Sequence, residues 1–368
     1  MAELTTAAGP SFELELTAKP LPQAERAAVM TNPGFGSVFT DHMVRVDWDS
    51  QSGWDGHRVV ANQPISLWPA AAVLHYAQEI FEGLKAYRWD DGSIRTFRPW
   101  ANAERFGRSA QALALPVLDP AAFVASLEAL VQVDGEWTPS GDGTSLYLRP
   151  FMFATEPFVG VRPARQVTYL LIASPVGAYF AGGLAPVSIW IDTVHHRAAR
   201  GGTGAAKCGG NYAASLVSQQ LAAANGCDQV LFLDAETESH LEELGGMNVM
   251  VVTAAGQVLT PPLDGCILAG ITRESIIQLC CERSVEVQEQ AIRLDWLLEA
   301  AASGEVSEVF ACGTAAVITP VGRLAGEGFE IEVGGGEIGP LTLSLYQELT
   351  DIQYGRRPDT RGWTHRLA

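Results

Sequence analysis

The sequence predicts two domains of the α/β or α+β class, joined by a short linker. The chain has 368 residues, more than one small domain needs. Stretches in which apolar and polar residues alternate, typical of strands, are interspersed with stretches of helical periodicity. The stretch GAYFAGGLAP, residues 177–186, interrupts both periodicities with glycines and a proline. We therefore predict a smaller N-terminal domain over residues 1–178, a linker over 179–187 and a larger C-terminal domain over 188–368.

In the first half, residues 1 to about 40 are polar and are expected to form an arm over the first domain. A helix is predicted over DPAAFVASLEALVQV, because Asp119 can cap it and Pro120 suits the first helical position. Four stretches of the first half read as strands: HMVRVDW, SIRTF, SLYLRPFMFAT and VTYLLIAS.

The second half repeats this mixture of elements. VSIWI and QVLFLD predict strands, and MNVMVVTAAGQVLTP predicts a hairpin that turns near Gly256. One helix is expected over NYAASLVSQQLAAANG, stopping at Gly226, and another follows Gly270 in TRESIIQLCCER. The last helix, LTLSLYQELTDIQYG, carries an apolar stripe of Leu341, Leu345, Leu349 and Ile352.

The charge balance excludes some classes of partner. Lys and Arg number 24 and Asp and Glu number 42, so the formal net charge is −18. Such a chain repels nucleic acid and anionic membrane surfaces. An anionic small molecule would need a local cluster of cations and backbone N–H groups.

The cysteines and the N-terminus suggest a cytoplasmic protein. None of the six cysteines forms a C-x-x-C pair and no His/Cys ligand spacing is present, so we expect no metal site and reduced thiols. MAELTTAAGPSFELEL lacks the basic start and apolar run of a signal peptide. No apolar stretch approaches the length of a membrane span.

The stretch GTGAAKCGGNYAASL, residues 202–216, places Lys207 among small residues. A Walker-type loop would need Gly before the lysine and Ser or Thr after it, where Ala206 and Cys208 stand. A dinucleotide fingerprint would need a third glycine at the position of Lys207. From this stretch alone, a functional lysine and a surface lysine on a strand remain equally open.

Four further stretches favour a functional lysine. In EELGGMNVMVV, Glu243 precedes a glycine pair and a strand. In LDGCILAGITRESI, Ile271 and Thr272 open a helix, whose N-terminus suits a phosphate. In FACGTAAVITP, Thr314 offers a hydroxyl after the end of a strand. The fourth comprises FEGLKAYR and RPWANAERFGRSA in the first half, the latter containing Arg105.

Together these stretches resemble the branched-chain aminotransferases, pyridoxal-phosphate (PLP) enzymes of fold type IV. The resemblance covers nearly the whole chain. Eight motifs occur in the family's order: FGSVFTDHM, LHYAQEIFEGLKAYR, SLYLRP, PVGAYFAGG, GGTGAAKCGGNYAASL, ELGGMNV, PPLDGCILAGITR and FACGTAA. It implies a C-terminal pseudo-barrel domain, a homodimer, and transamination of leucine, isoleucine and valine with 2-oxoglutarate by a ping-pong mechanism.

The resemblance also implies roles for cofactor-binding residues. Lys207 would form the Schiff base with the cofactor aldehyde and later carry the proton between the substrate α-carbon and C4′. Glu243 would bond the pyridine nitrogen and Tyr212 the phenolic oxygen. The phosphate would be held by Arg105, the N–H groups of Ile271 and Thr272, and the hydroxyl of Thr314, with Arg197 as a further contact on the cofactor side.

On the substrate side, the resemblance implies a pocket for both a branched aliphatic chain and the glutamate carboxylate. Arg149 would pair with that carboxylate, and the N–H groups of Ala315 and Ala316 would receive the substrate α-carboxylate. The remaining pocket positions are aromatic: Phe35, Tyr76, Phe81, Tyr147 and Tyr179.

Alternatives remain. Arg105 could be a solvated surface residue, and Phe81, Tyr147 and Tyr179 could be core aromatics. Gly246 stands where some family members carry a threonine, and the redox C-x-x-C of some animal members is absent after Thr314. Within the fold, a D-amino-acid aminotransferase or an aminodeoxychorismate lyase competes, although both are usually shorter. A non-catalytic nucleotide-binding protein is the third hypothesis.

Overall fold

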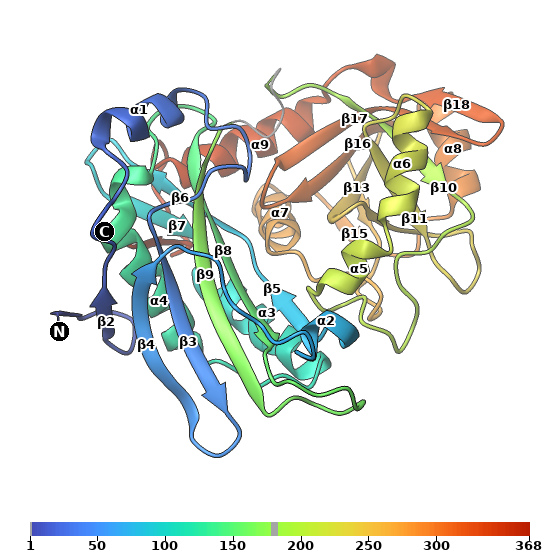
Figure 1. The fold of residues 1–368 in the computed structure, drawn as a ribbon. Helices are drawn as coiled ribbons and strands as arrows, with labels where there is room; N and C mark the ends of the chain where they lie inside the picture. Colours follow the sequence, from blue (N-terminus) through green and yellow to red (C-terminus); the bar gives the residue numbers. More distant parts are fainter. Residues whose placement is uncertain (1, 178–182) are drawn as a thin grey trace. The chain divides into compact units, whose positions relative to one another are not determined.

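A computed structural model describes residues 2–177 and 183–368, and the chain divides into two compact units (Figure 1). The first unit takes in two segments from later in the sequence, one of which contains Lys207. The predicted linker, 179–187, lies partly outside the described residues. The units are Met1–Tyr179 with Ala206–Gly209 and Asp351–Ala368, and Phe180–Ala205 with Gly210–Thr350.

The first unit is built on a ten-stranded, mostly antiparallel sheet. The C-terminal strand pairs with β7 at one edge, which ties the end of the chain to this unit. In spatial order the strands are β1 (Ala2–Leu4), β2 (Phe12–Glu15), β4 (Gly53–Ala61), β3 (His42–Asp49), β9 (Gln166–Val176), β8 (Ser145–Ala154), β6 (Leu84–Arg88), β7 (Ile94–Phe97) and β19 (Thr364–Arg366), with β5 (Glu79–Phe81) pairing β8.

Two helices, α3 (Pro99–Ala112) and α4 (Pro120–Asp134), pack on this sheet and on each other (Figure 1). The predicted cap of α4 is confirmed, because the Asp119 carboxylate accepts the Ala121 N–H at 2.7 Å. The apolar face of α4 is fully buried, including Phe123 and Leu127. The remaining helices of the unit are short: α1 (Gln23–Thr31), α2 (Val73–Tyr76) and η1 (Gly135–Trp137).

The second unit contains a closed barrel of six strands, as the pseudo-barrel expectation requires. The ring closes because β12 pairs with both β11 and β13. Around the ring, the strands are β12 (Leu241–Leu244), β11 (Gln229–Leu233), β10 (Val187–Asp192), β17 (Val317–Gly326), β16 (Val306–Gly313) and β13 (Met247–Thr253). Three strands extend it: β14 (Val258–Thr260), β15 (Val287–Glu289) and β18 (Phe329–Glu332).

The hairpin predicted at Gly256 is confirmed: β13 pairs antiparallel with β14, and Gly256 has a φ of +84°. The predicted helix over residues 211–226 is interrupted. Both the N–H and the hydroxyl of Ser215 bond to the Tyr212 carbonyl, at 3.0 and 2.7 Å, and this local turn ends one helix before the next begins. The helices here are α5 (Gly209–Ala213), α6 (Leu216–Ala224), α7 (Ile271–Glu282), α8 (Leu294–Ser303), η2 (Gly334–Gly336) and α9 (Pro340–Gln353).

Within residues 2–177 and 183–368, no helix is long and apolar enough to cross a membrane.

Candidate active site

Lys207 is held through its backbone on both sides. Its N–H donates to Ser109 Oγ on α3 at 2.9 Å, and its carbonyl accepts the Phe81 N–H of β5 at 3.0 Å. Its ammonium nitrogen lies 4.8 Å from the centroid of the Phe81 ring. The backbone of Lys207 is thus anchored to α3 and β5, and its amine lies over an aromatic ring.

Arg105 is a buried residue of α3 and not a solvated one. Its side chain forms a two-point ion pair with Glu82, with Nε 2.7 Å from Oε1 and Nη2 2.9 Å from Oε2. Arg105 is 4% exposed and Glu82 is completely buried. Arg108, one turn further along the helix, is exposed. Of the two arginines, only Arg105 is therefore fixed in one direction.

Arg149 on β8 contacts two predicted substrate residues, Tyr147 and Phe81, and a third packs on Tyr147. Arg149 Nη2 donates to the Tyr147 hydroxyl at 2.9 Å, and its guanidinium lies 4.8 Å from the Phe81 ring centroid. The Phe35 ring packs against Tyr147 with centroids 5.4 Å apart. Arg149 Nε is buried and has no hydrogen-bond partner among the described residues. This donor within an aromatic wall suits the carboxylate of a ligand.

The two other predicted pocket tyrosines are not part of this cluster. Tyr76, at the end of α2, donates its hydroxyl to the Val159 carbonyl at 2.6 Å, and its ring packs near Phe158. Tyr179 lies outside the described residues.

In the second unit, Glu243 lies on β12 and is buried among donors. Its Oε1 accepts the Leu268 N–H at 2.6 Å, and its Oε2 lies 3.3 Å from Arg197 Nε. Arg197 also donates to the carbonyls of Cys266 and Gly204. The arginine and the carboxylate thus hold the loop that leads to α7, and Glu243 is a buried acceptor beside a guanidinium.

Asn248, which is not among the residues predicted from the sequence, contacts the same loop as Glu243. It pairs with Glu243 across the β12–β13 hairpin, and its Nδ2 donates to the Leu268 carbonyl at 3.0 Å. A Cβ atom on Gly270 would lie 1.9 Å from Asn248 Oδ1, so only glycine fits there. The sequence offered one signal, an asparagine within a run of apolar strand residues, which needs a specific partner once buried.

The start of α7 has the features of an anion site. Ile271 and Thr272 open the helix as predicted, and both are buried. Gly270 at the N-cap position provides no capping side chain. The N–H groups and the positive end of the helix dipole are features that favour an anion at this helix start.

Tyr212 and the predicted Thr314–Ala316 segment also belong to this unit. Tyr212 is on α5, and a Cβ atom on Gly246 would lie 3.1 Å from its ring, so the glycine at this position gives the ring room. Thr314, Ala315 and Ala316 form the turn between β16 and β17. Val317, directly after it, has a φ of +63°, a strained conformation for a β-branched residue and one that is common at functional sites.

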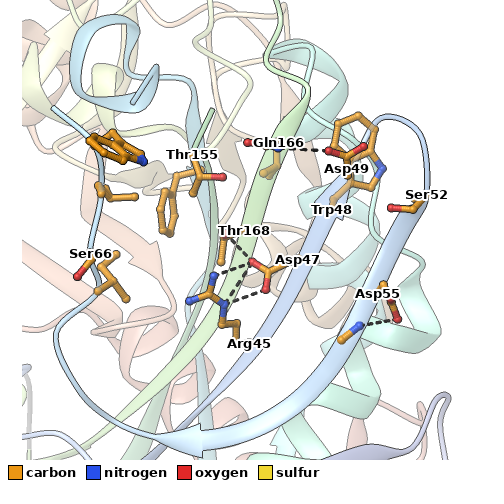
Figure 2. A pocket seen from close by; sticks show the side chains of 17 residues that line it. Arg45, Asp47, Trp48, Asp49, Ser52, Asp55, Ser66, Thr155, Gln166 and Thr168 are labelled. Atoms are coloured by element: carbon orange, nitrogen blue, oxygen red, sulfur yellow. Dashed lines mark hydrogen bonds and ion pairs between the residues drawn. The ribbon is translucent and has the colours of Figure 1, made fainter. Parts of the chain in front are cut away.

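A cavity of about 470 Å³ on the first unit contains none of the predicted residues (Figure 2). It is lined by β3, β4 and β9 together with the segment around Trp68. Among the described residues of this lining, the one cation, Arg45, is already paired with Asp47, which also accepts from Thr168 at 2.8 Å. This lining offers no amine or unpaired cation, so it is not the candidate active site.

Comparison with known proteins identifies the family. Residues 79–324 match the family described as amino-transferase class IV. The chain is 52% identical to a branched-chain-amino-acid aminotransferase of Mycobacterium tuberculosis (strain CDC 1551 / Oshkosh), over 97% of this chain and 98% of the relative.

Solved structures agree with this match. The crystal structure of the Escherichia coli branched-chain amino acid aminotransferase superposes with a TM-score of 0.73 at 28% identity, covering 88% of this chain and 99% of that one. The branched-chain aminotransferase of the thermophilic archaeon Thermoproteus uzoniensis, solved with norvaline, gives a TM-score of 0.72 at 25% identity, with coverage of 88% and 100%. The chain therefore belongs to the class IV aminotransferase family and, within it, to the branched-chain-amino-acid aminotransferases.

Proposed function

We propose that the protein transfers the amino group of leucine, isoleucine or valine to 2-oxoglutarate, giving the branched-chain 2-oxo acids and L-glutamate in two alternating half-reactions. The observation that carries the proposal is the Lys207 amine on the Phe81 ring, which also lies against Arg149. The amine can act as the nucleophile. The aromatic wall can contact an aliphatic side chain, and the cation beside the wall can bind a substrate carboxylate.

The residues present fit PLP as the cofactor. Its phosphate needs cations and N–H groups, which Arg105 and the start of α7 provide in their respective units. Its ring nitrogen needs an anionic acceptor, and Glu243 is a buried carboxylate held by donors. When bound, PLP provides the electron sink that stabilises negative charge at the substrate α-carbon.

In the first unit, we assign three tasks. Lys207 holds the cofactor covalently between reactions and moves the proton at the substrate α-carbon. Arg105 binds the phosphate. Arg149 binds the glutamate side-chain carboxylate, while Phe35, Phe81 and Tyr147 contact the aliphatic side chain. Tyr76 and Tyr179 stay in the proposal as pocket residues that lie outside the cluster around Arg149.

In the second unit, Glu243 would accept a hydrogen bond from the ring nitrogen of bound PLP, and Arg197 would keep that carboxylate in place. Tyr212 donates to the phenolic oxygen. Further phosphate contacts come from the Ile271 and Thr272 N–H groups and the Thr314 hydroxyl, and the Ala315 and Ala316 N–H groups receive the substrate α-carboxylate.

We also propose a homodimer in the cytoplasm. Large apolar side chains are exposed on the first unit, including Trp68 (72% exposed), Val159 (71%) and Val161 (89%), and contact with a second copy would bury such side chains. All six cysteines are free thiols, which suits a reducing compartment.

A substrate panel tests the proposal. The purified protein, loaded with PLP, is assayed with each branched-chain L-amino acid and 2-oxoglutarate, and glutamate formation is measured. Activity on all three, with little on D-alanine, is the expected result. Preference for D-alanine, or cleavage of aminodeoxychorismate without amino-group transfer, would instead support the competing activities of the same fold.

A further inference from the structure

Glu82 is a buried carboxylate to which the proposed chemistry gives no task. It has no exposed surface, and both of its oxygens are engaged by the Arg105 fork at 2.7 and 2.9 Å. Asn102, one helical turn before Arg105, donates to Glu82 Oε2 at 2.8 Å. Two donors from one face of α3 therefore converge on this one side chain.

The backbone at Glu82 is anchored as firmly as its side chain. Its N–H donates to the Pro150 carbonyl at 2.7 Å, and the preceding Phe81 N–H bonds the Lys207 carbonyl at 3.0 Å. A Cβ atom on Gly83 would lie 2.1 Å from the Tyr147 hydroxyl oxygen, so the following residue is closely packed too. The backbone that carries the Glu82 carboxylate is thus hydrogen-bonded to Pro150 of β8, and the residue before it is hydrogen-bonded to Lys207.

The carboxylate is the ionised form. Burial opposes ionisation, but the Arg105 guanidinium, with Lys207 and Asn102, holds the pKa of Glu82 below its usual value. A buried ion pair is an inefficient way to stabilise a fold, because the desolvation of both charges offsets their attraction. A bidentate pair does, however, fix the plane and direction of a guanidinium.

We propose that Glu82 is a positioning residue: its two-point contact with Arg105 holds the guanidinium in the orientation that binds the cofactor phosphate, so that the enzyme prefers PLP over unphosphorylated pyridoxal. The inference rests on the proposed role of Arg105. It assigns to Glu82 no contact with the cofactor or the substrate.

The test compares two cofactors that differ only in the phosphate. Full-length enzyme is loaded with PLP or with pyridoxal, and the dissociation constant of each is measured by equilibrium dialysis with absorbance detection. Glu82→Gln keeps the size of the side chain but replaces one acceptor oxygen by a donor, which breaks one arm of the fork. We expect PLP affinity to fall about 10- to 100-fold and pyridoxal affinity to change less than about threefold.

The matched control is Glu104→Gln, on the exposed face of the same helix, which should leave both affinities unchanged. Equal losses of PLP and pyridoxal in Glu82→Gln would mean that Glu82 only supports the scaffold, and would overturn the inference. If Glu82→Gln does not fold, Glu82→Asp takes its place. The aspartate keeps the negative charge, but its side chain is one methylene shorter, so the carboxylate lies further from Arg105. This variant should show the same selective loss of PLP affinity.

Arg105→Gln separates this inference from the function on which it rests. If that variant also loses PLP affinity selectively, Arg105 binds the phosphate, and the result for Glu82 stands on its own. If Arg105→Gln leaves the preference for PLP intact, the proposed role of Arg105 is wrong, and the inference for Glu82 is wrong with it.

Discussion

Arg197 Nε lies 3.3 Å from Glu243 Oε2, and both side chains are buried. The other oxygen of Glu243 accepts the Leu268 N–H at 2.6 Å, so one carboxylate oxygen has a hydrogen-bond donor and the other has an ion-pair partner. The neighbouring Glu242 differs: it is equally buried, but its Oε2 has no hydrogen-bond partner among the described residues. Two adjacent glutamates of one strand therefore have different environments: Glu243 lies beside a guanidinium and an N–H donor, whereas burial raises the pKa of Glu242 to about 7.

Glu243→Gln is expected to bind PLP but to lose about 10²- to 10³-fold in turnover, because a neutral amide cannot hold the ring nitrogen in its protonated form. Glu242→Gln is the matched control and should stay within about twofold of the unmodified rate. Steady-state rates with leucine and 2-oxoglutarate measure both. If the two variants exchanged behaviours, the assignment of Glu243 would be wrong and Glu242 would take its place.

Lys207→Ala should reduce turnover by at least about 10³-fold while the protein stays folded and still binds PLP noncovalently. The phosphate contacts proposed for Arg105 and the start of α7 do not depend on the lysine side chain. Turnover and circular dichroism check the two halves of this prediction. The exposed Lys19→Ala serves as the control and should be fully active. Substantial transamination by Lys207→Ala would exclude the lysine as the proton carrier.

Arg149→Met should weaken the glutamate half-reaction far more than the leucine half-reaction. Methionine keeps an apolar wall beside Phe81, but a desolvated glutamate carboxylate loses its charged partner, at a cost of about 2–5 kcal/mol. Stopped-flow absorbance measures the two half-reactions separately, with the exposed Arg165→Met as control. Equal losses for glutamate and leucine would show that Arg149 supports the pocket without discriminating between substrates.

The stability of the fold should depend on pH through Glu242. Burial raises the pKa of this carboxyl to about 7 from an ordinary value of 4.5. Between these two pH values the folded protein holds a proton that the unfolded chain has released. The contribution of Glu242 to the free energy of unfolding is therefore fully present below pH 4.5 and is lost as the pH rises through 7.

Glu242→Gln stays neutral at every pH. Urea unfolding measures the free energy of unfolding of both proteins at pH 5 and pH 8. From pH 5 to pH 8 this free energy should fall by about 1–2 kcal/mol less in the variant than in the unmodified protein. An identical pH dependence in both proteins would contradict the raised pKa.

The sequence by itself determined the local elements and the order of the motifs. Asp119 and Pro120 marked the start of α4, Gly256 the hairpin turn, and Gly270 the residue before α7, and each of these is confirmed. Each of these features depends on neighbouring residues alone. Asp119 caps a helix, Gly256 adopts a positive φ in a turn, and Gly270 occupies an N-cap position. The order of the eight motifs along the chain was likewise sufficient to identify the family.

The tertiary structure alone decided which distant residues meet. Glu82 and Arg105 are 23 positions apart, and Glu243 and Leu268 are 25 apart, so no local periodicity predicts either contact. The closure of the barrel through β12 and the pairing of β19 with β7 also depend on strand order and register, which long-range packing sets. At Ser215 the apolar pattern of the sequence continues, but the helix does not. The Ser215 hydroxyl bonds to the Tyr212 carbonyl where one helix ends and the next begins. Sequence patterns thus determine elements one at a time, whereas the partners of a buried charge follow from the packing of the whole chain.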